Sequence, residues 1–212
     1  MRILVACEES QTVTKELRRL GHEAYSCDII ECSGGHPEWH LQVDALELLK
    51  MKWDMIIAHP PCTYLMSAGA VRLYDKNHNI KDEARYESGQ RAAQFFMQIY
   101  NCGAPKIAIE NPTPMKVFGL PKYSQIIEPY MFGDPWRKRT CLWLRGLPPL
   151  IQTEAAVEPK GLWVGSTSAR RDPSVKDRYT LASHRSQKER SKTFPGIARA
   201  MAEQWAGDAR CQ

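Results

Sequence analysis

The chain has 212 residues and a formal net charge of +5, with 43% apolar and 25% charged residues. These values are those of an ordinary folded protein, which excludes a disordered chain and a membrane protein as classes, and the length suits one domain with a sizeable core. The sequence holds no apolar run near the length of a membrane span, and its first residues have the pattern of a strand instead of a signal peptide. We therefore expect a single cytoplasmic domain over residues 1–212.

Short apolar strands alternate with helical patterns from the start of the chain. The pattern predicts strands at 3–7, 24–27 and 55–58, with helices at 13–20 and 45–51. This order of strand and helix is typical of a parallel sheet with helices on both faces.

The second half of the chain begins with the same alternation of helix and strand and then departs from it. A long helix is expected at 82–100 and a strand at 106–109. Beyond a turn at 130–135, the extended segment 137–144 indicates a late pair of strands, forming an antiparallel hairpin near the sheet edge, and a final helix is expected at 195–206. Together the elements imply an α/β fold with a doubly wound, mostly parallel sheet and a late antiparallel strand.

The positive charge is concentrated in a basic insertion before the last helix. Residues 166–192 hold eight basic and three acidic side chains, so this segment alone carries a charge equal to that of the whole chain. Such a segment suits contact with a phosphate backbone, and equally suits a solvated loop. Arg170 and Arg171 are the residues in it that we expect to contact nucleic acid.

Seven cysteines occur without a C-x-x-C pair, which favours free thiols in a reducing compartment. One group has loosely metal-like spacing: Cys27, Cys32, His36 and His40. Because Cys27 falls at the end of a strand pattern, we expect four unconnected residues and no metal site.

Two strand ends carry candidate catalytic groups. The strand at 55–58 runs into His59-Pro60-Pro61-Cys62, and two prolines cannot continue the ladder, so Cys62 stands on a stiff loop. The strand at 106–109 runs into Glu110-Asn111. Because the carboxyl ends of parallel strands form the ligand-binding edge of such sheets, we expect the thiol and the carboxyl group to lie together, which suits covalent catalysis with acid assistance.

This pair of groups suits chemistry on a pyrimidine ring. A thiolate that adds to the electron-poor C6 of cytosine makes C5 nucleophilic enough to accept a one-carbon group, if an acid shares a proton with N3 and a cation holds the ring oxygen. Cys62 and Glu110 suit the first two roles. Arg137, Lys138 and Arg139 are candidates for the third.

The order of these landmarks resembles the DNA cytosine-5 methyltransferase family over nearly the whole chain. That family has Pro-Cys followed by Ser and Gly, as in Pro61-Cys62 and Ser67-Ala68-Gly69, and Glu-Asn after a later strand, as in Glu110-Asn111. It then has a Tyr/Phe-Gly-x-Pro turn before paired basic residues, as at 132–135 and 137–139. The resemblance implies a Rossmann-like SAM-methyltransferase fold, S-adenosyl-L-methionine (SAM) as cofactor and DNA as partner, and we expect a monomer or weak dimer.

The resemblance also implies roles for individual residues. The catalytic set is Cys62, Glu110, Arg137 and Arg139. The cofactor contacts are Cys7, Glu8, Asp28, Ile29, Asp44, Ala45 and Pro60. The substrate contacts are His59, Pro61, Ser67, Asn111, Lys138, Arg170 and Arg171.

Three departures from the family mark the chain as a small, phage-type relative. The first loop, residues 7–12, has no glycine, one residue fewer separates Pro135 from Arg137 than is usual, and no large target-recognition region precedes the last helix. These departures leave open the transfer of another one-carbon group, action on a free pyrimidine nucleotide, and a non-catalytic module that binds nucleic acid. Because residues 59–62 are also similar to the Pro-Pro-aromatic loop of amino-group methyltransferases, methylation of N4 or N6 is a further alternative.

Overall fold

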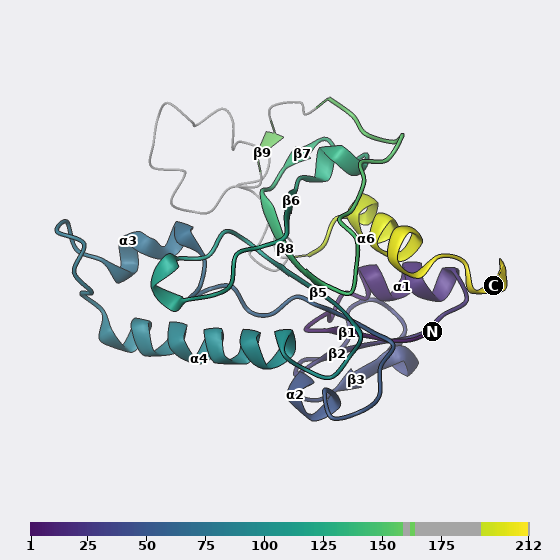
Figure 1. Cartoon of the computed structure of the whole chain (residues 1–212), viewed down its shortest axis with the longest axis horizontal. Helices are drawn as coiled ribbons and strands as arrows, with labels where there is room; N and C mark the ends of the chain where they lie inside the picture. Colours follow the sequence, from purple (N-terminus) through teal and green to yellow (C-terminus); the bar gives the residue numbers. More distant parts are fainter. Residues whose placement is uncertain (159–161, 164–191, 212) are drawn as a thin grey trace.

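The computed structural model describes residues 1–158, 162–163 and 192–211, and is built around a seven-stranded sheet of order β3-β2-β1-β4-β5-β8-β6 (Figure 1). The strands of this sheet are β1 (Arg2–Ala6), β2 (Glu23–Asp28), β3 (His40–Gln42), β4 (Met55–Ala58), β5 (Lys106–Asn111), β6 (Gln125–Ile127) and β8 (Thr140–Arg145). The first five pair in parallel, and β8 is antiparallel to both β5 and β6. A second small sheet pairs β7 (Trp136–Arg137) with β9 (Leu162–Trp163).

This architecture confirms the expected α/β fold: a doubly wound, mostly parallel sheet with a late antiparallel strand. The chain builds outward from β1 to β3 and then returns to place β4 and β5 on the other side of β1. The reversal between β1 and β4 is the topological switch point, where loops diverge and leave a crevice at the carboxyl edge of the sheet.

Helices cover both faces of the sheet. The α-helices are α1 (Thr12–Arg19), α2 (Ala45–Leu48), α3 (Ala70–Leu73), α4 (Glu83–Tyr100) and α6 (Pro195–Met201), which continues as the π-helical turn η8 (Ala202–Ala206). Short 3-10 turns are η1 (Pro37–Trp39), η2 (Ser67–Gly69), η3 (Lys116–Phe118), η4 (Pro129–Phe132) and η9 (Ala209–Cys211). Helices α1 and α6 pack together on one face, and α2 and α4 contribute to the core of the other face (Figure 1).

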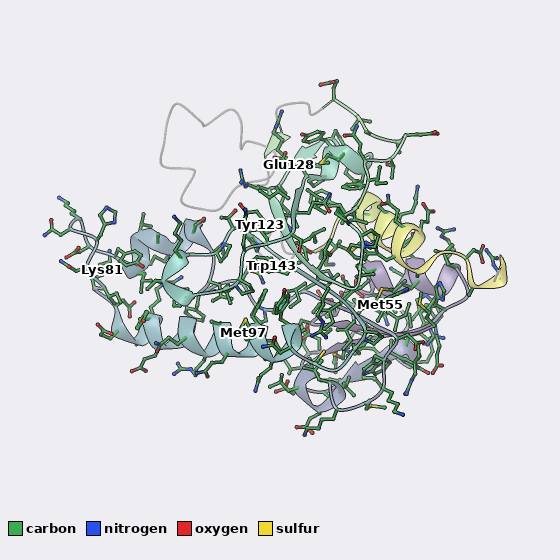
Figure 2. All side chains as sticks on the ribbon, viewed as in Figure 1. Met55, Lys81, Met97, Tyr123, Glu128 and Trp143 are labelled. Carbon is green, nitrogen blue, oxygen red and sulfur yellow. The ribbon has the colours of Figure 1, made fainter. Side chains whose placement is uncertain are left out.

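The two faces of the sheet build separate hydrophobic cores, because successive strand residues point in opposite directions. Ile3 of β1 packs on the side of α1 and α6, and Leu4 packs on the side of α4. On that second side, the buried ring of Trp143 lies edge-on to Phe96 at 5.0 Å and to Tyr123 at 5.9 Å. Figure 2 labels Trp143 and Tyr123 in this part of the molecule. These aromatic contacts join β8 to α4 and fix the antiparallel strand inside the sheet.

The segment predicted as one extended strand at 137–144 is divided between two sheets. Residues 136–137 belong to the small sheet and residues 140–145 to the large one, so the chain crosses between the sheets at Lys138 and Arg139. The antiparallel partner of β8 at the sheet edge is β6, which precedes the turn at 130–135. The predicted helix at 45–51 is a single helical turn.

Two further expectations concern the chain outside these elements. Of the basic insertion at 166–192, only Lys192 falls within the described residues, so the roles of Arg170 and Arg171 stay predictions. No helix in the described part of the chain combines the length and the apolar character needed to cross a bilayer.

Candidate active site

The ends of β4 and β5 bring two expected site residues into contact. These strands are neighbours and parallel, with Ala58 opposite Ile109, so the next residue of each strand, His59 and Glu110, also lie side by side. Nδ1 of His59 lies 2.9 Å from Oε2 of Glu110, and the two side chains are only 13% and 9% exposed. The main-chain N–H of His59 donates to the carbonyl of Ala6 at 2.9 Å. A buried, hydrogen-bonded pair of a histidine and a glutamate thus stands at the carboxyl edge of the sheet.

The loop after β4 holds Cys62 in a defined place. The side-chain amide of Asn111 donates to the carbonyl of Pro60 at 2.9 Å, which ties the loop to the end of β5. The main-chain N–H groups of Leu65 and Met66 both donate to the carbonyl of Cys62 at 3.0 Å. Because Pro60 and its neighbour also restrict the backbone, the half-buried thiol sits on a rigid turn.

The ionisable groups at this edge change one another's pKa values. Burial raises the pKa of the Cys62 thiol and the negative charge of Glu110 raises it further, whereas Lys138 lowers it. Burial alone would raise the pKa of Glu110, but Lys138 and the hydrogen bonds from His59 and Thr193 lower it to about 2. The hydroxyl of Thr193 donates to Oε2 of Glu110 at 3.2 Å. At neutral pH the protein therefore holds Glu110 as a carboxylate and Cys62 mainly as a thiol.

The three basic side chains of residues 137–139, after the turn, lie in different surroundings. Lys138 is the basic residue whose charge lowers the pKa of both Cys62 and Glu110. The guanidinium of Arg137 lies 5.2 Å over the ring of Tyr130, and its charge meets a glutamate next to η4. Arg139 is exposed. The sequence left Arg137, Lys138 and Arg139 open as the cation, and Lys138 is the one whose charge acts on both the thiol and the carboxylate.

A cavity of about 260 Å³ opens at the switch point, and its wall contains most of the residues expected to contact the cofactor. It is lined by Cys7, Asp28, Ile29, Val43, Asp44, Ala45, Pro61, Ala92 and Phe95. The two carboxylates come from the end of β2 and from the residue that caps α2. Since Pro61 belongs to the loop that carries Cys62, the cavity and the thiol adjoin. Pro60, which the sequence placed here, is buried in the sheet edge instead.

Glu8 has a structural role that the sequence did not predict. Its carboxylate accepts hydrogen bonds from Val13 N at 2.6 Å, from Thr14 N at 3.3 Å and from the Thr14 hydroxyl at 2.7 Å. The residue at the N-cap position, Gln11, makes no capping hydrogen bond of its own. The buried Glu8 carboxylate therefore caps helix α1, and it does not line the cavity.

The glycine-free first loop adopts backbone conformations that glycine normally supplies. Cys7 and Gln11 have φ angles of 59° and 57°, in the left-handed region that costs an ordinary residue roughly 1–2 kcal/mol. Gln11 is held there by its side chain, which donates to the carbonyl of His36 at 2.8 Å and accepts from its N–H at 3.1 Å. Burial, aided by Cys27, raises the pKa of the Cys7 thiol far above its usual range, so Cys7 forms a wall of the cavity and not a nucleophile.

The loosely spaced cysteines and histidines do not converge. Cys27 is buried in the core, and the ring of His36 stacks on Trp39 at 3.8 Å. Both ring nitrogens of His40 have hydrogen-bond partners, and the thiol of Cys32 contacts a glutamine side chain. Within the described ranges, no three His, Cys, Asp or Glu side chains are arranged to hold a metal ion.

Several residues at the site had no signal in the sequence. Thr193 is far from Glu110 along the chain and reaches it because the residues before α6 fold back against β5. Ala92 and Phe95 of α4 line the cavity, and Ala93 takes a buried position on that helix. Ser67, an expected substrate contact, is exposed at the first residue of η2.

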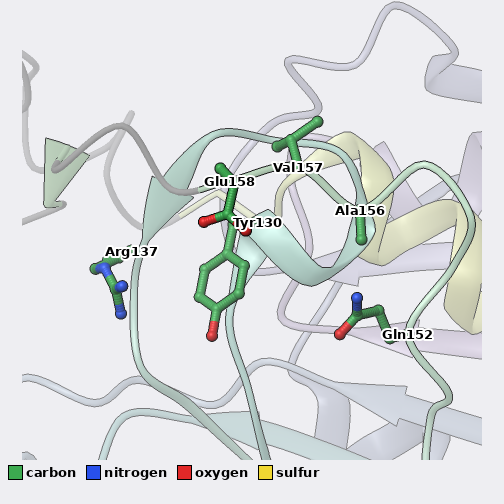
Figure 3. A pocket seen from close by; sticks show the side chains of 6 residues that line it. All are labelled: Tyr130, Arg137, Gln152, Ala156, Val157 and Glu158. Atoms are coloured by element: carbon green, nitrogen blue, oxygen red, sulfur yellow. The ribbon is translucent and has the colours of Figure 1, made fainter.

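A larger cavity, of about 430 Å³, lies beside η4 and β7 (Figure 3). It is lined by Tyr130, Arg137, Gln152, Ala156, Val157 and Glu158. Its wall has no thiol, and Arg137 is its one expected site residue. The smaller cavity beside Cys62 is therefore the better candidate for the active site, despite its size.

Comparison with known proteins adds little to this geometry. No protein-family model matches the chain, and no curated protein does. One solved structure that is similar to it is an E. coli prophage protein proposed to be a DNA modification methyltransferase, with 15% identity and a TM-score of 0.42. The match covers 67% of this chain and 45% of that one, so the chain spans less than half the length of that protein. The fold assignment rests on the strand order described above.

Proposed function

We propose that this chain is a SAM-dependent methyltransferase that acts at C5 of cytosine in DNA through a covalent adduct with Cys62. The observation that carries the proposal is the placing of three groups at one sheet edge: the Cys62 thiol, the Glu110 carboxylate, which raises the pKa of that thiol, and the Lys138 ammonium, which lowers the pKa of both. A nucleophile, a carboxyl group that can pass a proton to N3 and a cation are what a cytosine ring needs for addition at C6.

The cavity at the switch point suits the cofactor. The Asp28 and Asp44 carboxylates are acceptors for ribose hydroxyls and the adenine amine, and Ile29 and Phe95 offer apolar surface to a ring. Its volume of about 260 Å³ approaches the roughly 300 Å³ at which typical ligand pockets begin, and so fits the nucleoside part of SAM. Bound there, SAM would supply an electrophilic methyl group.

The chain's own residues would prepare the pyrimidine. Cys62 would add to C6, and Lys138 would favour the thiolate that this addition needs, because its charge opposes the effects that raise the thiol pKa. Asn111 would keep the loop in place through its hydrogen bond to Pro60. A base in a duplex must be flipped out of the stack before either face of its ring can meet the thiol.

The proposal is tested by incubating the protein with methyl-labelled SAM and, in parallel, duplex DNA, single-stranded DNA, RNA and dCMP. The expected product is 5-methylcytosine in DNA. Cys62→Ser should abolish transfer and keep the wild-type affinity for SAM, whereas Asp44→Asn should weaken SAM binding and leave the Cys62 thiol open to alkylation. An N-methylated base as product, or transfer by Cys62→Ser, would overturn the proposed mechanism.

A second measurement traps the adduct. In DNA that contains 5-fluorocytosine, the ring has no C5 proton to lose after methyl transfer, so the bond to Cys62 cannot be released. The wild-type protein should gain the mass of the DNA strand, and Cys62→Ser should not. An adduct on a different cysteine would contradict the assignment.

A further inference from the structure

The proposed chemistry requires an acid at N3, but the structure holds Glu110 in its ionised form. Its pKa is about 2, because Lys138 and His59 together outweigh the effect of burial. At neutral pH a carboxyl group with this pKa has no proton to give. The proton that N3 takes up must therefore be held by a group next to Glu110.

His59 is the group in direct contact with Glu110. Its Nδ1 lies 2.9 Å from Oε2 of Glu110, and the hydroxyl of Thr193 lies 3.2 Å from the same oxygen and 3.4 Å from Nδ1. The main-chain hydrogen bond of His59 to Ala6 fixes its backbone, and Pro60 follows at once. A rigid backbone and a buried ring leave the imidazole little freedom to turn away.

The charges around His59 favour its protonated form. Burial lowers the pKa of the ring, but the hydrogen bond and charge of Glu110 raise it, and Glu8 raises it further from the loop after β1. Lys138, from the segment between β7 and β8, opposes them. The net effect raises the pKa above the ordinary value of 6.5, which favours the protonated ring.

His22 is an example of a histidine whose ring has a structural role. Both ring nitrogens of His22 have partners, the N-terminal amine at 3.3 Å and the carbonyl of Gly207 at 2.8 Å. Nε2 of His59 is buried and has no hydrogen-bond partner among the residues that the structure describes. A buried polar atom without a partner needs an explanation, and a catalytic role is one that suits a histidine beside Glu110.

We propose that His59 is a positioning residue that stores the proton needed at N3 of the target pyrimidine and passes it through Glu110. This proposal rests on the proposed function. The Cys62 thiol first loses its proton to water. As the bond from the thiolate Sγ of Cys62 to C6 forms, the C5=C6 π bond breaks and a C4=C5 π bond forms. The electron pair of the C4=N3 π bond moves to N3 and takes a proton from Glu110, which receives that proton from Nδ1 of His59. Release of Cys62 from C6 returns the proton along the same route.

The addition step is measured without methyl transfer, as loss of tritium from C5 of labelled cytosine in DNA to water. Because Cys62 is mainly a thiol, its reactive thiolate fraction grows with pH, so wild-type exchange should rise with pH and level off as the pH passes the pKa of His59. In His59→Asn, whose amide keeps a neutral donor near Glu110, exchange should be about 100-fold slower at neutral pH and should keep rising with pH, without this plateau. His78→Asn, a substitution at an exposed histidine with φ of 62°, is the matched control and should keep the wild-type rate and pH profile.

A direct titration keeps the proposal testable if His59→Asn does not fold. The NMR signal of the His59 ring in the wild-type protein should titrate above the ordinary 6.5, and its pKa should fall in Glu110→Gln. A wild-type rate and pH profile in a folded His59→Asn variant would refute the role of His59, and so would titration of His59 below that ordinary value. Neither result would refute the proposed function. A wild-type protein that neither methylates nor exchanges any of the tested substrates would refute the proposed function and this role with it.

Discussion

Replacing Glu8 by alanine should destabilise the folded protein by about 2–4 kcal/mol, because the carboxylate is the cap of helix α1. Loss of an N-cap costs roughly 0.5–2 kcal/mol, and a charge at a partly buried helix N-terminus contributes up to about 2 kcal/mol. Alanine also leaves Val13 N and the Thr14 N–H and hydroxyl without their acceptor, and a buried unpaired donor costs about 1–3 kcal/mol. Because these three contributions overlap, their simple sum would be too large, and we expect a total loss of about 2–4 kcal/mol.

Urea and thermal unfolding followed by circular dichroism measure this effect. For a chain of this length, a loss of about 2–4 kcal/mol corresponds to a decrease in Tm of roughly 4–16 °C. Glu47→Ala is the matched control: Glu47 is exposed on α2 and pairs with Lys50 at 3.0 Å, so its loss should cost less than about 1 kcal/mol.

The outcome distinguishes the two roles considered for Glu8. A change of less than about 0.5 kcal/mol in Glu8→Ala would refute the capping role, since surface substitutions commonly have effects of that size. If the variant instead kept its stability and bound SAM more weakly, the cofactor contact expected from the sequence would be the correct assignment. We expect a destabilised protein that, while folded, binds SAM with nearly wild-type affinity.

Two other predictions concern the thiol and the last helix. Lys138→Met should raise the pKa of Cys62 and slow its alkylation by iodoacetamide near neutral pH, by about tenfold for each unit of pKa, and an unchanged rate would contradict the placement of the ammonium. Gly196→Ala should lower the free energy of unfolding by more than about 2 kcal/mol, because a Cβ there would lie 2.0 Å from a main-chain carbonyl of η4. Gly103→Ala is the control, because a Cβ added at Gly103 would meet no atom within 4 Å; equal stability of the two variants would contradict the close packing of α6.

The local sequence determined the main elements with good accuracy. The strand predicted at 55–58 is β4 with the same bounds, because an apolar run ends there at two prolines. The long helix was predicted to within one residue, since Asp82 caps it by accepting from Arg85 N at 2.9 Å. Strand β6 was missed, because a strand of three residues with only two apolar side chains, Ile126 and Ile127, gives too little pattern.

The sequence also determined which groups gather at the carboxyl edge of the sheet. Asp28, Asp44, Cys62 and Glu110 each follow a strand or precede a helix, and the topology of parallel strands alone brings such positions together. What each side chain does there was decided by contacts between distant segments. Tertiary structure turned Glu8 into a helix cap, selected Lys138 over Arg137 as the cation beside Cys62, and brought Thr193 to Glu110. Spacing along the chain could not predict these outcomes, because they depend on side-chain directions and on which segments pack against the site after folding.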